Sequence, residues 1–430
     1  MLGTLKQNTM ISFKKLEGPY GIPVYFQHMP DMVQSVSMSW TILVGSADDE
    51  SVGAPGLYHW FEHVPFRGTK EYPGGYKEIK KPFTKNGGFI NASTGQQSTN
   101  YFATVPLKIW RESLSIITDL LSQPLLTEEG INAEREIIVQ EIAQRRATSR
   151  GNAFYELPAI LWPDHPLGHN VLGSEETLRS MTASVMQAAH KANYDRSRCV
   201  FFIAGNIDED ELMFELKKAA AVIPDHGLSE KRVPESYGPL PAWKNGQITT
   251  IETSFKSSVI FSLFPIPKSG DPLKKYFQWN ILENMFAYGD LDSPLSRILR
   301  DERKLVYNTS MVGHYLLDGG YCGFMAEAQS KNIDPIVKSF GDVLRDSQVY
   351  SPSRLDEVKT GIAGSIDIEP VDTSSYISQA SRCLISAGKP FGDNEYLEAL
   401  GKVTPSDIKN IICSIDPSSI HTVIFKGTDK

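Results

Sequence analysis

The chain has 430 residues, of which 41% are hydrophobic and 22% are charged, and its formal net charge at pH 7 is −8. A chain of this length exceeds one ordinary hydrophobic core and predicts two domains of roughly 200 residues each. The acidic balance, with no long run of Lys or Arg, disfavours a nucleic-acid partner, because such proteins need a basic surface. No apolar stretch reaches the roughly 18 residues that a membrane helix needs, so we expect no membrane span.

The N-terminal residues and the cysteines indicate the cellular compartment in which the protein is expected to reside. The opening stretch, MLGTLKQNTMISFKKLEG, lacks the apolar core of a signal peptide and the Arg-rich helix of a transit peptide. Cytoplasmic residence is therefore the default expectation. The cysteines are far apart in sequence and form no C-x-x-C pair, so we expect buried thiols in a reducing compartment; they are Cys199, Cys322, Cys383 and Cys413.

A strand predicted within residues 33–44 is followed by a short segment that carries metal-binding chemistry. Residues 56–64, GLYHWFEHV, contain the pattern H-x-x-E-H. On a helix, His59 and His63 project from one face, and Glu62 lies beside them. Two imidazoles with an adjacent carboxylate are typical of a catalytic zinc site that keeps one position open for water, and this order is the inverzincin motif. The alternative is a polar helix face on which two histidines flank a glutamate by chance. The aromatic residues of the segment can anchor the helix in the core: Tyr58, Trp60 and Phe61.

Residues 89–105 predict a pair of strands, introduced by Gly87 and Gly88. These glycines either let another backbone approach closely or form an ordinary turn. The sequence itself favours neither interpretation.

Residues 127–147 predict a helix that could supply a third ligand. Thr127 can cap it, and Glu134 and Glu141 lie seven residues apart, hence on one face. Ile137 and Ile138 lie between them and can bury the helix beside the metal. Without the H-x-x-E-H motif, a solvated acidic face balanced by neighbouring arginines would be the better interpretation.

The remaining elements repeat this order. Residues 180–206 predict a helix, a loop and a strand, and residues 224–246 are rich in Pro, Gly and charge, which is typical of a linker. A strand is again predicted at 257–264, a strand pair at 306–328, a helix at 352–368, and a helix, loop and strand at 403–427. We therefore predict an α+β protein with two homologous domains, each a mainly antiparallel sheet with helices packed on one face. The predicted bounds are 1–225 for the first domain, 226–246 for the linker and 247–430 for the second domain.

The motifs together resemble the pitrilysin, insulysin and mitochondrial processing peptidase family of inverzincins, in its two-domain subfamily. The resemblance spans nearly the whole chain and rests on GLYHWFEHVPFRGT, NGGFINASTGQQSTNYFATV, EREIIVQEI and SRILRDERKLVY. It implies one Zn²⁺ per chain, completed by Glu141, with Glu134 supporting catalysis. Two positions depart from the family pattern: Pro65 should end or bend the motif helix, and Lys304 stands where many relatives carry Gly.

The same resemblance implies a substrate-binding surface. Asn91 and Ala92 match an edge strand that pairs with the substrate, where Asn91 would hold polar groups and Ala92 would pair by its backbone. Arg300 and Tyr307 match residues that reach the active site from the second domain and position the peptide. Without the resemblance, a surface arginine is the commoner interpretation of Arg300.

We therefore expect a zinc-dependent endopeptidase with Glu62 as the base that activates water. A non-catalytic, peptide-binding subunit of the same family is the first alternative, and a metal hydrolase acting on small molecules is the second. The resemblance also implies a clamshell of four such domains around the substrate, so we expect this two-domain chain to form a homodimer. A monomer, or a heterodimer with a related subunit, is the alternative.

Overall fold

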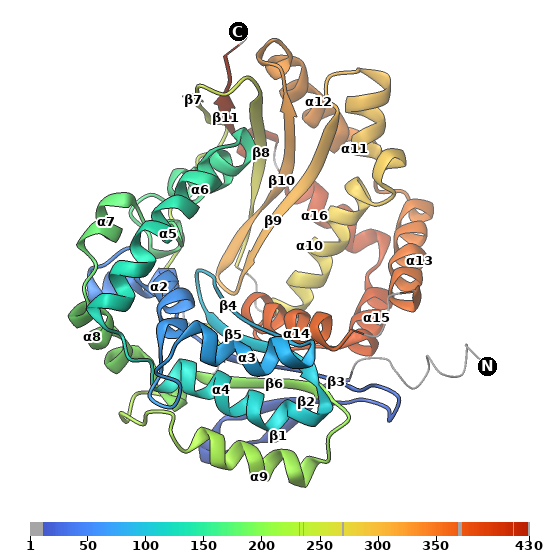
Figure 1. Cartoon of the computed structure of the whole chain (residues 1–430). Helices are drawn as coiled ribbons and strands as arrows, with labels where there is room; N and C mark the ends of the chain where they lie inside the picture. The colour runs from blue at the N-terminus through green and yellow to red at the C-terminus, as the bar shows by residue number, and fades with distance from the viewer. Residues whose placement is uncertain are drawn as a thin grey trace. The chain divides into compact units, whose positions relative to one another are not determined.

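The structure is a computed structural model that describes residues 12–231, 233–234, 236–268, 271–368, 372–415 and 417–428. It contains two sheets with helices packed against them, and the predicted fold class is confirmed (Figure 1). The chain divides into two compact units. Unit 1 comprises the described residues within 1–143, 164–237 and 370–394, and unit 2 comprises those within 144–163, 238–369 and 395–430.

The sheet of unit 1 has six strands in the order β1-β2-β6-β3-β5-β4. Strands β2 and β6 pair in parallel, and the other neighbours pair antiparallel. Strand β4 lies at one edge, so one of its sides has no neighbouring strand in this sheet. The strand bounds are β1 Lys14–Glu17, β2 Pro23–His28, β3 Ser35–Ile42, β4 Phe89–Thr94, β5 Thr99–Pro106 and β6 Cys199–Gly205.

The sheet of unit 2 has five strands in the order β7-β11-β8-β10-β9. Strands β7 and β11 pair in parallel, and the other neighbours pair antiparallel. Each predicted strand in the second half is confirmed within a few residues. The strand bounds are β7 Ile248–Glu252, β8 Ser258–Ile266, β9 Asn308–Leu316, β10 Gly319–Ala328 and β11 His421–Lys426.

The predicted helices also form, within a few residues of their predicted bounds. In the described part of the chain, no helix combines the length and apolar character needed to cross a bilayer. The helices are α2 Leu57–His63, α3 Tyr76–Asn86, α4 Trp110–Ser122, α5 Glu128–Arg146, α6 Ser149–Leu161, α7 Glu175–Ser180, α8 Ala183–Asn193, α9 Glu209–Ala220, α10 Pro272–Ala287, α11 Pro294–Ser296, α12 Ile333–Arg345, α13 Pro352–Ile368, α14 Thr373–Ala387, α15 Asp393–Lys402 and α16 Pro405–Ser414.

Side-chain alternation along β3 gives the two faces of its sheet different neighbours. Trp40 is fully buried and donates from its indole Nε1 to the Thr118 hydroxyl of α4 over 2.8 Å. Ser37 points to the opposite face, where its hydroxyl lies 2.7 Å from that of Thr373 at the start of α14. In Figure 1, α14 therefore lies across the sheet from α4. The sequence predicted helices on one face of each sheet, so the packing of α14 on the second face was not predicted.

The two units exchange one helix each relative to a division of the chain at a single linker. Helix α14 comes from the second half of the sequence and packs on β3 and β6. Helix α6 comes from the first half and packs on β8 and β11. The order of elements along the chain does not reveal this exchange. Helices α6 and α14 occupy the same positions in that order whichever sheet they pack on. The predicted boundaries of the two homologous domains stay a prediction.

The cysteines divide into two classes. Cys199, Cys322 and Cys383 are buried, as expected. Cys413 is exposed, so the expectation of four buried thiols was wrong at this position. The buried contact of α16 is Ile408, and a residue five positions later points about 140° away from it around the helix.

Candidate metal centre

Helix α2 is anchored at its start and along its buried face. Gly56 starts it in a left-handed conformation, with φ of 87°, and the buried Asp49 carboxylate accepts from the Gly56 and Tyr58 backbone N–H groups over 2.6 and 3.2 Å. Burial raises the pKa of Asp49 well above its usual range, although these N–H groups oppose the shift. The helix ends at His63, and Pro65 lies in the following 3₁₀ turn, so the predicted break is confirmed. All three aromatic residues of the motif are fully buried: Tyr58, Trp60 and Phe61.

Helix α5 brings the second part of the cluster. The Thr127 hydroxyl accepts from the Gly130 N–H over 3.1 Å, so the predicted cap forms. Ile138 is fully buried, but Ile137 is 45% exposed, so the prediction that both would bury the helix was wrong. Adjacent helical residues point about 100° apart, and only one of the two can face the core here.

The donor atoms of His59, His63 and Glu141 lie within 4.8 Å of one another. The Glu141 carboxylate oxygen Oε2 is 3.5 Å from Nε2 of His59 and 3.5 Å from Nε2 of His63. Two ligands about 2.1 Å from a tetrahedral zinc ion would be roughly 3.4 Å apart. Two imidazole nitrogens and one carboxylate oxygen are also the donor types of catalytic zinc sites. These residues therefore fit a zinc ion with an open position.

Glu62 lies beside this cluster, with its Oε2 3.8 Å from Nε2 of His59. Burial raises the pKa of its carboxyl to about 7, His63 opposes this shift, and the charge of Glu141 adds to it. A carboxyl group with a pKa near neutrality both accepts and returns protons readily at pH 7. Glu62 is thus placed beside the donor cluster as a candidate acid–base group.

Glu134 contacts the back of one histidine instead of joining the donor cluster. Its Oε2 lies 3.3 Å from His63 Nδ1, and its Oε1 accepts from Nε of Arg67. Burial alone would raise the pKa of Glu134, but the bonds from His63 and Arg67 outweigh it and lower the pKa. A carboxylate in this position fixes the ring orientation of a ligating histidine.

Sequence reasoning missed two residues that support this arrangement. Arg67 pairs with Glu134 and lies 5.2 Å from the centre of the Tyr76 ring, and Asp49 anchors the start of α2. Arg67 lies in a stretch that carried the family resemblance, so its charge near the motif was an available signal. Asp49 lies seven residues before the glycine that it contacts, and no helical or strand spacing links the two.

The predicted substrate residues of unit 1 lie on the edge strand β4. Asn91 is exposed and Ala92 is buried, in a strand that alternates between the two environments. Helix α2 packs against β4, and the Thr94 hydroxyl donates to the Tyr58 carbonyl over 3.3 Å. Gly87 ends α3 with φ of 74°, and a Cβ on Gly88 would come within 2.8 Å of the Thr104 carbonyl oxygen. The pair thus combines a turn with a close backbone approach.

Arg300 and Tyr307 belong to unit 2, whereas the donor cluster belongs to unit 1. Arg300 lies in a π-helical turn, Arg297–Glu302, and its guanidinium is 5.6 Å from the centre of the Tyr307 ring. Tyr307 is 87% exposed. Lys304 adopts a left-handed conformation with φ of 52°, which explains why glycine suits this position. The catalytic and substrate-binding roles of both residues stay predictions.

Comparisons with known proteins agree with this picture. Residues 27–175 match the model of the insulinase family, peptidase family M16, and residues 180–362 match the model of the peptidase M16 inactive domain. An uncharacterized zinc protease of Rickettsia felis is 24% identical over 99% of both chains. The mitochondrial-processing peptidase subunit beta of Saccharomyces cerevisiae is 22% identical over 91% of this chain and 86% of that protein. The crystal structure of a protease from Helicobacter pylori aligns with a TM-score of 0.83 at 17% identity, over 97% of this chain and 100% of the other. The chain belongs to the insulinase family of peptidases, family M16.

Proposed function

We propose that this protein is a zinc-dependent endopeptidase that hydrolyses peptides or unfolded polypeptide segments. The observation that carries the proposal is the convergence of His59, His63 and Glu141, with Glu62 at 3.8 Å from His59. Membership of a peptidase family and the name of the Rickettsia relative support the same reaction class.

The proposed roles follow from these contacts. His59, His63 and Glu141 would hold one zinc ion, which when bound supplies a Lewis acid that acidifies water and polarises the scissile carbonyl. Glu62 would accept a proton from the attacking water and deliver it to the leaving amine. Glu134 would hold His63 in the orientation that presents Nε2 to the donor cluster.

The proposed substrate is an extended peptide paired with β4. The strand lies at a sheet edge beside α2, so a peptide added there would run next to the donor cluster. The Asn91 side chain would bind the peptide's polar groups, and the Ala92 backbone would pair with it. We assign Arg300 and Tyr307 to substrate positioning, with the Tyr307 hydroxyl supporting the developing oxyanion.

A non-catalytic subunit is the main alternative, because the model matched by residues 180–362 describes an inactive domain. All six residues proposed to make up the metal centre and its immediate supports lie outside this range: His59, Glu62, His63, Arg67, Glu134 and Glu141. The complete donor set in the first half therefore favours catalysis. An exposed edge strand beside the donors favours peptides over small molecules as substrates.

The test is incubation with a random peptide pool, read by mass spectrometry with and without a zinc chelator. We expect internal cleavages that vanish on chelation and return when zinc is restored. Glu136→Gln serves as the matched control, since Glu136 lies on α5 but pairs with Arg179 at 3.5 Å on an exposed surface. No cleavage by a zinc-loaded wild-type protein would favour the non-catalytic alternative.

Self-association is a separate proposal. We expect a homodimer, with a mass near twice 47.8 kDa by light scattering at micromolar concentration. A monomer that is fully active on peptides would contradict the dimer and leave the proposed chemistry intact.

A further inference from the structure

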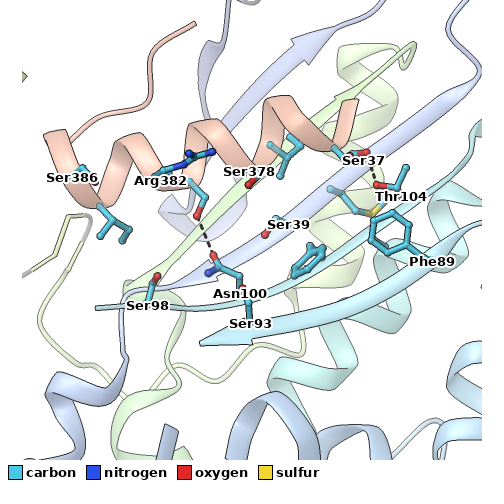
Figure 2. A pocket seen from close by; sticks show the side chains of 17 residues that line it. Ser37, Ser39, Phe89, Ser93, Ser98, Asn100, Thr104, Ser378, Arg382 and Ser386 are labelled. Atoms are coloured by element: carbon cyan, nitrogen blue, oxygen red, sulfur yellow. Dashed lines mark hydrogen bonds between the residues drawn. The ribbon is translucent and has the colours of Figure 1, made fainter. Parts of the chain in front are cut away.

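A pocket of about 420 Å³ lies in unit 1, between α14 and strands β3, β4 and β5 (Figure 2). None of the proposed metal-binding or catalytic residues lines it. It lies on the sheet face opposite α4, the face toward which Ser37 points. The mechanism proposed above gives this space no role.

The pocket exists because α14 packs closely on β6 and β3 but not on β5 and β4. Ile377, Ala380 and Leu384 of the helix pack in a cluster with Leu43 and Phe202. This contact places the apolar side of α14 over β6 and β3. A polar side of the helix is left facing β5 and β4, and it carries Ser374, Ser378, Ser381 and Arg382.

Two side chains that line the pocket, Asn100 and Arg382, can offer hydrogen-bond donors to a ligand. The Asn100 side-chain oxygen accepts from the hydroxyls of Thr41 and Ser381, over 2.7 and 3.1 Å. The amide N–H groups of Asn100 are therefore left to donate to a ligand. Arg382 is exposed and forms no ion pair with any described residue, and none of the described residues lining the pocket is acidic. The pocket thus suits a ligand that carries negative charge and accepts hydrogen bonds.

The opposite wall is apolar and belongs to the strand edge. Phe89 is 47% exposed, and its ring meets that of Phe102 edge to face, with ring centres 6.3 Å apart. Phe89 and Ser93 of β4 both line the pocket, whereas Ile90 and Ala92 are buried on the other face of the strand. The pocket therefore opens beside alternate residues of the same edge strand.

The side-chain alternation of a sheet connects this pocket to the substrate. A peptide added to β4 would lie about 4.8 Å away and would place every second side chain on the face of Phe89 and Ser93. We propose that the pocket is a subsite for an acidic side chain, preferably Glu, of an extended peptide paired with β4. This inference rests on the proposed function, because it assumes that β4 receives the substrate. A glutamate side chain reaches farther across the strand than aspartate, and its carboxylate would meet the Arg382 guanidinium and the Asn100 amide.

The test uses one cleavable peptide in which each position in turn carries Glu, Gln or Lys, with kcat/KM measured at an unchanged bond. For the wild type we expect Glu to exceed Gln roughly threefold to fivefold at one position, with no such preference at the two adjacent positions. Arg382→Gln should abolish this preference, and Arg382→Glu should reverse it in favour of Lys. Lys108→Gln, which removes an exposed positive charge elsewhere in unit 1, should leave it unchanged.

A second readout separates this inference from the proposed function. Binding of the same peptides to Glu62→Gln protein is followed by fluorescence anisotropy, which needs no turnover. Peptides that bind with the Arg382-dependent preference but are never cut by the wild type would sink the peptidase proposal and support the subsite. Peptides that are cut with equal preference in the wild type and both Arg382 variants would overturn the subsite alone. Failure of every peptide to bind would overturn both.

Discussion

Five of the six strands in the sheet of unit 1 repeat the arrangement of the sheet of unit 2, but the helices packed on the two sheets carry different side chains. The strand order β2-β6-β3-β5-β4 of unit 1 corresponds to β7-β11-β8-β10-β9 of unit 2, including the parallel first pair. In each unit a helix follows the central strand, α2 after β3 and α10 after β8. Within the described residues, one group of His, Cys, Asp or Glu side chains converges closely enough to hold a metal ion, and it lies in unit 1.

The difference lies in what each helix buries. Helix α10 buries apolar residues, among them Trp279, Leu282 and Phe286, in the core of unit 2. Helix α2 buries His59 among its aromatic residues and places the half-buried Glu62 beside it. The sheet thus supplies the scaffold in both units, whereas a few polar side chains on one short helix of unit 1 supply the candidate metal ligands.

The largest expected effect on activity comes from replacing the proposed base of unit 1, Glu62. Glu62→Gln should reduce peptide hydrolysis by about a thousandfold, because the amide keeps the side chain's shape but cannot accept the water proton. Zinc content should stay unchanged, since Glu62 is not among the proposed ligands. Turnover is measured with a quenched peptide, and Glu136→Gln should cleave at the wild-type rate. A rate for Glu62→Gln close to that of the wild type would assign the base to another group.

Glu134 and Glu141 lie on one face of α5 but contact different atoms. Glu141 lies near Nε2 of both histidines, whereas Glu134 lies near Nδ1 of His63. Glu141→Gln should weaken zinc binding by more than a hundredfold, since it removes a proposed ligand. Glu134→Gln should weaken it tenfold to a hundredfold at most and lower activity with the metal retained, because it removes only the support of His63. Competition with a chromophoric chelator measures both affinities. The opposite ranking would exchange the two roles.

The anchor of α2 should matter for stability. Asp49→Ala leaves the Gly56 and Tyr58 backbone N–H groups buried without their acceptor, and we expect a loss of about 3 kcal/mol in the free energy of unfolding. Asp49→Asn keeps one acceptor oxygen and should lose less. Urea denaturation of both variants gives the values. Equal stability of Asp49→Ala and the wild type would show that α2 does not depend on this carboxylate.

The cost of the buried carboxylate can be measured in chelator-treated protein. The folded-state pKa of Glu62 is about 7, above its ordinary value of 4.5. The contribution of the neutral Glu62 carboxyl to folding stability is therefore fully present below pH 4.5, and it is lost as the pH rises to about 7. Metal-free Glu62→Gln should therefore exceed metal-free wild type in stability by about 3 kcal/mol at pH 8, and the gain should shrink toward pH 5. Thermal unfolding at both pH values is the measurement. A pH-independent difference would mean that ionisation of Glu62 is not its cause.

The smallest expected effect lies in unit 2. Lys304→Gly should stabilise the protein by about 0.5–1 kcal/mol, because glycine adopts the left-handed conformation of this residue without steric strain. Zinc affinity should stay unchanged. Denaturant midpoints and the chelator competition test the two statements, and a destabilised Lys304→Gly variant would show that the side chain contributes more than its backbone strain costs.

The sequence predicted those features that depend on local spacing. Strand alternation, the i and i+4 spacing of His59 and His63, the Thr127 cap and the break at Pro65 were all readable, because each depends on neighbours within a few residues. The site's supports were not readable in this way. The bond from Arg67 to Glu134 spans 67 residues, and the exchange of α6 and α14 depends on which sheet each helix reaches. The exposure of Ile137 and Cys413 depended on how each helix is rotated against its sheet, which the local pattern did not specify.

The most direct test of the central claim is the zinc content of protein purified without added metal, measured by elemental analysis of the wild type and of His59→Ala, His63→Ala and Glu141→Gln. We predict one zinc per chain in the wild type and a substantial loss in each variant, with the fold retained by circular dichroism. A wild-type chain that contains no zinc and takes up none when it is supplied would contradict the account, as would zinc retained at full stoichiometry and affinity in all three variants.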